Sequence, residues 1–248
     1  MSKKLITIII STYNASKTIK NCLDSIEDQK NENCELIVID GKSSDNTIEI
    51  IKSYGSLVDK LISESDNGVY DAWNKGINIS DGEWIMFLGA DDILLKSSID
   101  TYLSNIKNNT KIKSIDYICA NNEYTDKQGN IVKILGDKPN YKKMSSRMVA
   151  AHVGSLHSKE RLFGQVGLYN LDFKICADYE LLLRKKNKLN FIFISKKIAR
   201  MSTGGMSFTS DAVYETFKIR KLHSTISPFR NILVLFYDLL TFYSFFYR

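Results

Sequence analysis

The sequence is poor in the residues that mark linkers and metal knuckles. Its 248 residues include only 2 prolines and 4 cysteines. The scarcity of proline argues against a proline-rich linker between domains. No two cysteines have the Cys-x-x-Cys spacing of zinc and redox motifs, and no apolar run near the N-terminus has the length of a signal peptide. We therefore expect a cytoplasmic protein with reduced cysteines.

The composition and charge restrict the partners. Hydrophobic residues make up 44% and charged residues 25% of the chain, which is typical of a folded domain. The formal net charge of +6 suits an anionic partner. The chain carries no nucleic-acid-binding motif, so we expect no nucleic acid partner. An anionic lipid surface and a polyphosphate-bearing substrate remain as candidate partners.

The first 95 residues alternate strand and helix signals, with apolar β-branched runs that are typical of buried parallel strands. Such an order predicts an α/β fold with a Rossmann-like, mostly parallel sheet and flanking helices. Ligands of these sheets bind beyond the carboxyl ends of the strands. The predicted strands span residues 5–10, 35–39, 58–62 and 83–88, and the predicted helices lie between them, the third at 69–79.

After residue 96 the pattern changes. A helix at about 97–107 precedes a hairpin with arms at 115–124 and 131–135. A helix at about 177–186 and a late strand at 190–194 follow. Glycines 204 and 205 favour either a loop that closes over a ligand or a simple turn.

Polar residues follow the first two predicted strands. After the first come Thr12, Tyr13 and Asn14. A tyrosine there can lie against a flat base while its neighbours supply hydrogen bonds, although a loop that caps the next helix has the same composition. Asp40 ends the second strand, where it can accept a hydrogen bond from a base or a ribose.

Two adjacent carboxylates, Asp91 and Asp92, follow the fourth predicted strand. They repel each other unless a cation or hydrogen-bond donors offset the charge. A hard divalent ion commonly takes one or two carboxylates together with substrate phosphates. The alternative is an Asp-rich turn that caps the following helix.

A polar segment at residues 63–76 leads into the third predicted helix. It contains Asp66 and Asn67 before Gly68, and Lys75 on the helix. Lys75 either approaches a phosphate or is a solvated surface lysine.

Four segments, in this order and at these spacings, resemble the nucleotide-binding half of family 2 glycosyltransferases with the GT-A fold. They are Thr12-Tyr13-Asn14, Asp40-Gly41 with Ser44, Asp45 and Thr47, Asp66-Asn67-Gly68 through Asn74-Lys75-Gly76, and Ala90-Asp91-Asp92. The resemblance covers roughly residues 5–95.

The resemblance implies a nucleoside-diphosphate sugar as donor, usually with uridine. Thr12, Tyr13, Asn14 and Asp40 would then face the base and ribose. Asp66, with Asn67 and Lys75, would hold the nucleotide or sugar. Asp91 and Asp92 would serve a diphosphate site with Mn²⁺ or Mg²⁺. The family often has an acidic residue where this chain has Gly89, and Asp92 is the preferred single metal ligand, with Asp91 next.

In the second half, Asp178 matches the family's catalytic aspartate at the start of a helix, although Ala177 replaces the glutamate that often precedes it. An inverting transfer needs a base to accept the proton of the acceptor hydroxyl. The alternative is an aspartate that only stabilises the helix dipole. Glu180 is predicted as a neighbour or acceptor contact.

His152 resembles a family position near the acceptor or diphosphate, with a packed structural histidine as the alternative. His157 is predicted to be structural. Alternation along an extended segment predicts that these two histidines point to opposite faces.

The last segment is rich in aromatic and aliphatic residues, but Asp238, Thr241 and Ser244 interrupt it. It is short for a membrane span. Basic residues precede it, so we predict an amphipathic helix that touches an anionic membrane surface. The alternative is a helix packed on the core or on a second subunit of a homodimer. The expected division is a GT-A catalytic domain at 1–225, with donor half 1–95 and acceptor half 96–225, and a helical tail at 226–248.

Together these features predict an inverting glycosyltransferase that moves a sugar from a UDP-sugar to a lipid-diphosphate-linked glycan, as in O-antigen or capsule synthesis, at the inner face of the cell membrane. A nucleotidyltransferase would need a glycine-rich basic loop after the first strand, which this chain lacks. A non-catalytic nucleotide-sugar-binding partner in an assembly complex is the alternative, because Gly89 and Ala177 depart from the family pattern.

Overall fold

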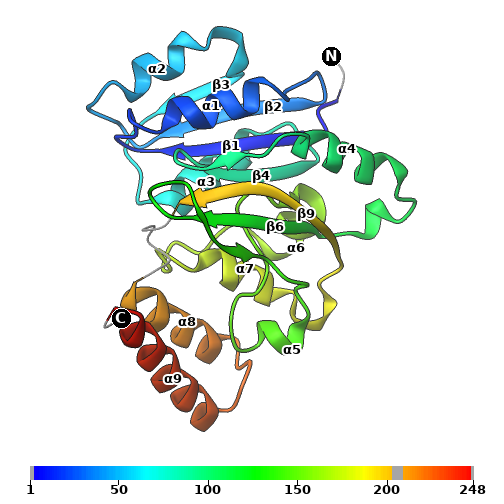
Figure 1. The fold of residues 1–248 in the computed structure, drawn as a ribbon. Helices are drawn as coiled ribbons and strands as arrows, with labels where there is room; N and C mark the ends of the chain where they lie inside the picture. Colours follow the sequence, from blue (N-terminus) through cyan, green and yellow to red (C-terminus); the bar gives the residue numbers. More distant parts are fainter. Residues whose placement is uncertain (1–2, 203–208, 247–248) are drawn as a thin grey trace.

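The computed structural model describes residues 3–202 and 209–246, and a single nine-stranded sheet runs through it (Figure 1). The strand order is β3-β2-β1-β4-β8-β6-β9-β5, and β7 pairs with β6. The predicted α/β class is therefore confirmed. The strands are β1 (Ile6–Thr12), β2 (Cys34–Asp40), β3 (Lys60–Ser63), β4 (Trp84–Gly89), β5 (Ile93–Leu94), β6 (Tyr117–Thr125), β7 (Ile131–Leu135), β8 (Leu156–Ser158) and β9 (Phe191–Ser202).

The first four strands are parallel, and their register sets the position of the polar residues. Thr12 pairs with Asp40, Ser11 with Gly89, and Asp40 with Ser63. The carboxyl ends of these strands therefore meet at one edge of the sheet. The segments that follow them, although up to 77 residues apart in sequence, open onto the same side of the molecule.

Helices cover both faces of the sheet because the strand side chains alternate between them. Ile8 and Ile10 of β1 belong to one core cluster, with residues of α1, α2 and α4. Ile9 belongs to the other, with residues of α3 and α7. The helices are α1 (Ile19–Glu27), α2 (Thr47–Ser53), α3 (Val69–Ile79), α4 (Ser98–Asn108), α5 (Tyr141–Met144), α6 (Gly164–Val166) and α7 (Ala177–Arg184).

The late strand β9 differs most from its prediction. It has 12 residues and pairs in parallel with β6 and antiparallel with β5. The sequence pattern ended the strand at residue 194 because Ser195, Lys196 and Lys197 follow. These three side chains are exposed, so hydrogen bonding to β6 continues the strand where the apolar pattern stops. Glycines 204 and 205 lie outside the described residues.

The C-terminal helices α8 (Ser210–Leu222) and α9 (Pro228–Phe246) form a hairpin at the end of the molecule away from α1 and α2 (Figure 1). The buried Arg220 of α8 joins them. Its guanidinium donates to Asn231 Oδ1 at 2.6 Å and pairs with Asp238 at 3.2 Å. Within residues 3–202 and 209–246, no helix is both long enough and apolar enough to span a membrane.

Candidate active site

A pocket of about 550 Å³ opens at the carboxyl ends of β1 and β4. It contains five residues that the sequence predicts for the donor: Thr12, Tyr13, Asn14, Asp66 and Asp91. Ala15, Thr18, Ser11, Gly68, Val69, Ala72, Gly89 and Ala90 complete its lining. The first turn of α3 therefore forms part of the wall.

Tyr13 is the exposed aromatic group of this pocket, with 67% of its surface accessible. Its ring and the Asp66 carboxylate both pack over the backbone of Gly41. A Cβ atom at position 41 would lie 2.8 Å from Asp66 Oδ2 and 3.3 Å from Tyr13 Cδ2. Glycine at position 41 thus lets an aromatic ring and a carboxylate lie together at the rim, an arrangement that suits a base and a ribose.

Thr12 offers a polar atom in the pocket wall. Among the described residues, its buried Oγ1 has no hydrogen-bond partner. An unpaired buried hydroxyl costs roughly 1–3 kcal/mol, so a ligand that pairs with it recovers this free energy.

Asn14 and Asp40 hold the loop beside the pocket. Asn14 Oδ1 accepts from the Ser44 backbone N–H at 2.9 Å, and the Asn14 backbone N–H donates to Ser43 Oγ at 2.8 Å. Asp40 is fully buried and accepts from the Ser43 N–H at 2.9 Å and from Ser63 Oγ at 2.7 Å. The Asp40 carboxylate therefore stabilises the loop, and its contact with a base or ribose remains a prediction.

Lys75 and Asn67 lie outside the lining of this pocket in the described part of the chain. Lys75 Nζ pairs with Glu64 at 2.9 Å and donates to the Ser65 carbonyl oxygen at 2.8 Å. It therefore fastens the segment that carries Asp66. The predicted phosphate contact would require Lys75 to leave both partners.

Asp91 and Asp92 have different surroundings. Asp91 is exposed and lines the pocket. Asp92 is buried, and its Oδ2 accepts from the Gly89 N–H at 2.6 Å. Burial, followed by the charge of Asp91, raises the pKa of Asp92 to about 8. The geometry thus presents Asp91 to a ligand, whereas the sequence interpretation placed Asp92 first.

The pair suits a hard divalent ion. A Cβ at Gly89 would lie 3.0 Å from Asp91 Oδ1 and 3.1 Å from Asp92 Oδ2, so both carboxylates converge on this glycine. Among the described residues no group of three His, Cys, Asp or Glu side chains could hold a metal. The remaining ligands would therefore come from substrate phosphates and water, as is common for Mg²⁺.

Asp178 lies at the start of α7, as predicted, and lines a second pocket of about 560 Å³ between α7, α8 and α9. Burial raises the pKa of Asp178 to about 6. The hydroxyl of Tyr70, on α3, donates to the Ile175 carbonyl oxygen at 2.6 Å and lies 3.1 Å from Asp178 Oδ1. The helix that lines the pocket at the ends of β1 and β4 therefore also contacts the candidate base.

Glu215 of α8 fixes the segment before Asp178 from the other side. Its carboxylate accepts from the backbone N–H groups of Lys174, Ile175 and Cys176 at 2.7–2.9 Å. Sequence reasoning missed both Tyr70 and Glu215, because both act on residues that lie far from them in the sequence.

Glu180 has structural partners. It is buried, and it pairs with Arg184 and with His223 Nε2, the latter at 2.8 Å. These charges, together with their hydrogen bonds, outweigh the burial and lower the pKa of Glu180. A direct contact between Glu180 and an acceptor remains a prediction that would require Glu180 to exchange these partners.

The expectation that His152 and His157 face apart is wrong. Their rings touch, with His157 Nε2 3.2 Å from His152 Nδ1. The physical reason is a turn, in which the Ser155 N–H donates to the His152 carbonyl oxygen. The strand β8 begins only at Leu156, so strand alternation does not relate the two residues.

Both histidines are buried in an aromatic cluster. The His152 ring stacks on Phe87, and its Nε2 lies 3.2 Å from the Tyr169 hydroxyl. Burial lowers the pKa of His152 to about 3. In the described part of the chain, His152 lines neither of the two pockets. Its acceptor role stays a prediction, and its surroundings are those of a packed neutral histidine.

Comparisons with known proteins identify the family of this chain. The family model described as Glycosyl transferase family 2 matches residues 7–163. A PGL/p-HBAD biosynthesis glycosyltransferase of Mycobacterium bovis (strain BCG / Pasteur 1173P2) is 29% identical over 191 residues, which cover 74% of this chain and 70% of the relative. The UDP-Glc:alpha-D-GlcNAc-diphosphoundecaprenol beta-1,3-glucosyltransferase WfgD of Escherichia coli is 33% identical over 124 residues, 49% of each chain.

Solved structures share the fold. Residues 1–349 of S. aureus TarS in complex with UDP superpose with a TM-score of 0.69 at 15% identity, covering 93% of this chain and 69% of that chain. The mannosyltransferase PcManGT from Pyrobaculum calidifontis, in complex with GDP-Man and Mn²⁺, superposes with a TM-score of 0.63 at 14% identity, covering 88% of this chain and 64% of that chain. Because the family model spans more than half of the sequence, the chain belongs to glycosyltransferase family 2, and its architecture is the GT-A fold.

Proposed function

We propose that this glycosyltransferase takes a sugar from a UDP-sugar and adds it, with inversion, to a lipid-diphosphate-linked glycan during assembly of a bacterial surface polysaccharide. The observation that carries the donor assignment is the pocket that combines the exposed Tyr13 ring with the carboxylates of Asp66 and Asp91. The TarS complex with UDP and the name of WfgD, which includes a diphosphoundecaprenol acceptor, support the two substrate classes.

The reaction is a single displacement at the anomeric carbon. The acceptor hydroxyl oxygen forms the new bond to this carbon while the bond to the diphosphate oxygen breaks, and the leaving diphosphate keeps the electron pair. Asp178 accepts the hydroxyl proton. Bound Mn²⁺ or Mg²⁺ at Asp91 and Asp92 would offset charge on the diphosphate.

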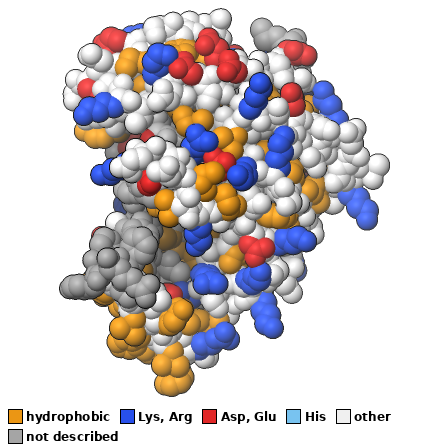
Figure 2. Space-filling model, viewed as in Figure 1, with side chains coloured by type: hydrophobic (Ala, Val, Ile, Leu, Met, Phe, Trp, Pro, Cys, Tyr) orange, Lys and Arg blue, Asp and Glu red, His pale blue; other side chains and the backbone are white. Residues whose placement is uncertain are grey.

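The surface of α9 supports a position at the inner face of the cell membrane. Exposed apolar side chains cluster over α8 and α9 at one end of the molecule, beside Lys and Arg residues (Figure 2). On α9 they recur at helical spacing and form an apolar stripe, which consists of Phe229, Ile232, Leu233, Phe236, Tyr237, Leu240 and Tyr243. Lys218, Lys221 and Arg230 are exposed nearby. An apolar face flanked by basic residues suits an anionic lipid surface, and a homodimer is the alternative use.

The decisive test of transfer against mere binding is Asp178→Asn. Loss of the base lowers turnover by about 10²–10⁴-fold, while the affinity for UDP stays unchanged because Asp178 is outside the lining of the donor pocket. Turnover is measured by UDP release with membrane-extracted glycolipid as acceptor. The matched control is Asp172→Asn, an exposed carboxylate in the same segment. A non-catalytic binding partner would show no turnover in the native chain.

A further inference from the structure

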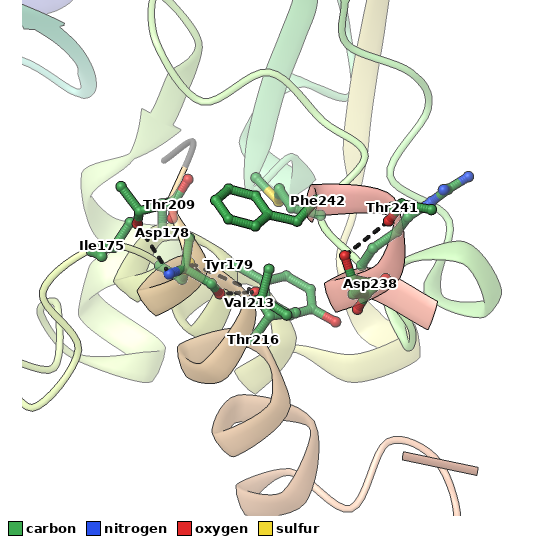
Figure 3. A pocket seen from close by; sticks show the side chains of 13 residues that line it. Ile175, Asp178, Tyr179, Thr209, Val213, Thr216, Asp238, Thr241 and Phe242 are labelled. Carbon is green, nitrogen blue, oxygen red and sulfur yellow. Dashed lines mark hydrogen bonds between the residues drawn. The ribbon is translucent and has the colours of Figure 1, made fainter. Parts of the chain in front are cut away.

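The pocket beside Asp178 has apolar walls between charged ends. Asp178 lies at one end and Asp238 at the other, with Phe242 between them (Figure 3). Val213 and Tyr179 form the opposite wall in the same view. The volume of about 560 Å³ exceeds what a hydroxyl group needs at the base, so an acceptor in this pocket brings further atoms with it.

The lining indicates the chemistry of those atoms. Met148, Ile175, Ala212, Val213 and Phe242 are apolar and come from segments far apart in sequence. An apolar group buried against them gains roughly 25 cal/mol for each Å² removed from water. A free sugar, whose hydroxyl groups need polar partners, matches this wall poorly.

The charges at the pocket favour an anion beside the apolar group. Arg147 lines the pocket and is exposed. The carboxylate of Asp238, which would otherwise repel an anion, is paired with the Arg220 guanidinium at 3.2 Å. Arg147 can therefore contact a phosphate of a ligand in the pocket.

One wall of the pocket is α9, which connects the pocket to the apolar stripe. Asp238, Thr241 and Phe242 face the pocket, whereas Phe236 and Leu240 are exposed. The apolar stripe and one wall of the pocket therefore share a helix, which suits a ligand that is carried by a lipid.

We propose that this pocket binds the isoprenyl phosphate end of the acceptor, with the first isoprene units against Val213 and Phe242 and a phosphate at Arg147. The inference rests on the proposed function and deepens it, because it assigns the part of the acceptor that the chain recognises beside its base. The sugar then extends from the phosphate towards Asp178.

Calorimetry with geranyl diphosphate tests this assignment without knowledge of either sugar. The full chain is first saturated with UDP and Mn²⁺, so that the added diphosphate cannot enter the donor pocket. We expect binding of geranyl diphosphate, weaker binding of geraniol and no binding of inorganic diphosphate. Val213→Trp, which fills the pocket, should lower the affinity for geranyl diphosphate by about tenfold or more and leave the affinity for UDP unchanged. Arg147→Gln should reduce the preference for geranyl diphosphate over geraniol.

Ile232→Trp is the matched control, because it places the same side chain on the apolar stripe and should not change binding of the soluble ligand. Phe242→Ala, which removes one wall, provides a second variant if Val213→Trp does not fold. The pocket assignment alone would be overturned if geranyl diphosphate did not bind to the UDP-loaded chain. It would also be overturned if Val213→Trp and Phe242→Ala both bound geranyl diphosphate with the affinity of the native chain. Failure to bind UDP itself would overturn the donor site and, with it, this acceptor assignment.

Discussion

At the scale of single residues, the strand ends made the position of the proposed donor pocket predictable. Tyr13 and Asp91 follow buried strands, and both line the pocket. The rule that ligands bind beyond strand ends needs only the strands to be identified. The rule does not say which of two neighbouring carboxylates faces outward. Gly89 decides this, because its N–H binds Asp92 and leaves Asp91 exposed.

The environment of Asp178 predicts a pH dependence of activity. Burial disfavours the charged carboxylate and raises its pKa to about 6. A base must be deprotonated to act, so kcat/KM should be constant above this pKa and fall about tenfold per pH unit below it. The measurement is kcat/KM across the acidic range, with circular dichroism at each pH to confirm folding. A profile that is flat down to the ordinary pKa of an aspartate, near 4, would contradict the assignment of Asp178 as the buried base.

At the scale of elements, the sequence predicted α3 and α7 well but not how they are joined. The apolar periodicity of residues 69–79 matches α3 in full. The contacts that connect α3 and α8 to Asp178 involve Tyr70 and Glu215, which lie 108 and 37 positions away in sequence. Local patterns carry no information on such pairs. The same holds for β9, which pairing with β6 extends beyond its apolar run.

Glu215 gives a prediction at this scale. Glu215→Gln removes the negative charge and keeps one acceptor oxygen, while its NH2 group takes the place of the other oxygen and repels the backbone N–H that this oxygen bound in residues 174–176. Hydrogen bonds to a charged group contribute roughly 1.5–3 kcal/mol, so the free energy of unfolding should fall by about this amount. Because the segment precedes Asp178, kcat should fall while the affinity for UDP stays constant. Urea unfolding and initial rates measure the two effects.

Asp211→Asn serves as the control for Glu215→Gln, since Asp211 is exposed on the same helix. A Glu215→Gln variant with native kcat would show that these hydrogen bonds do not position the base.

At the scale of the whole molecule, the α8–α9 hairpin carries both the apolar stripe and a wall of the Asp178 pocket. The sequence predicted the amphipathic helix from its spacing and charges. It did not predict that Arg220 would be buried between α8 and α9 and would connect the two helices. A basic residue before an apolar helix indicates a lipid contact when only the sequence is considered. The basic residues that remain exposed are those that still suit this role.

The apolar stripe predicts attachment to anionic vesicles. Phe236→Ser combined with Leu240→Ser removes two large apolar side chains, each worth roughly 1.5–3 kcal/mol when buried, so the partition coefficient should fall by about tenfold or more. Co-sedimentation with phosphatidylcholine vesicles, with and without phosphatidylglycerol, measures it. Ile131→Ser with Val132→Ser, which alters exposed apolar residues on β7, is the control.

Equal vesicle binding by the native and stripe variants would contradict membrane attachment through α9. A native dimer in sedimentation velocity that dissociates in the stripe variant, without vesicle binding, would assign the stripe to a second copy of the chain.

Binding of a nucleotide sugar with a divalent ion in the pocket at the ends of β1 and β4 is the step on which the proposed transfer depends. Its most direct test is UDP release from a panel of UDP-sugars, with Mn²⁺ and with chelator, by the native chain, Asp91→Asn and Asp92→Asn. We predict metal-dependent release from one donor, with a larger loss in Asp91→Asn than in Asp92→Asn, because Asp91 faces the pocket. If calorimetry on the same samples detected no binding of any nucleotide sugar, the assignment of this pocket to the donor would be contradicted.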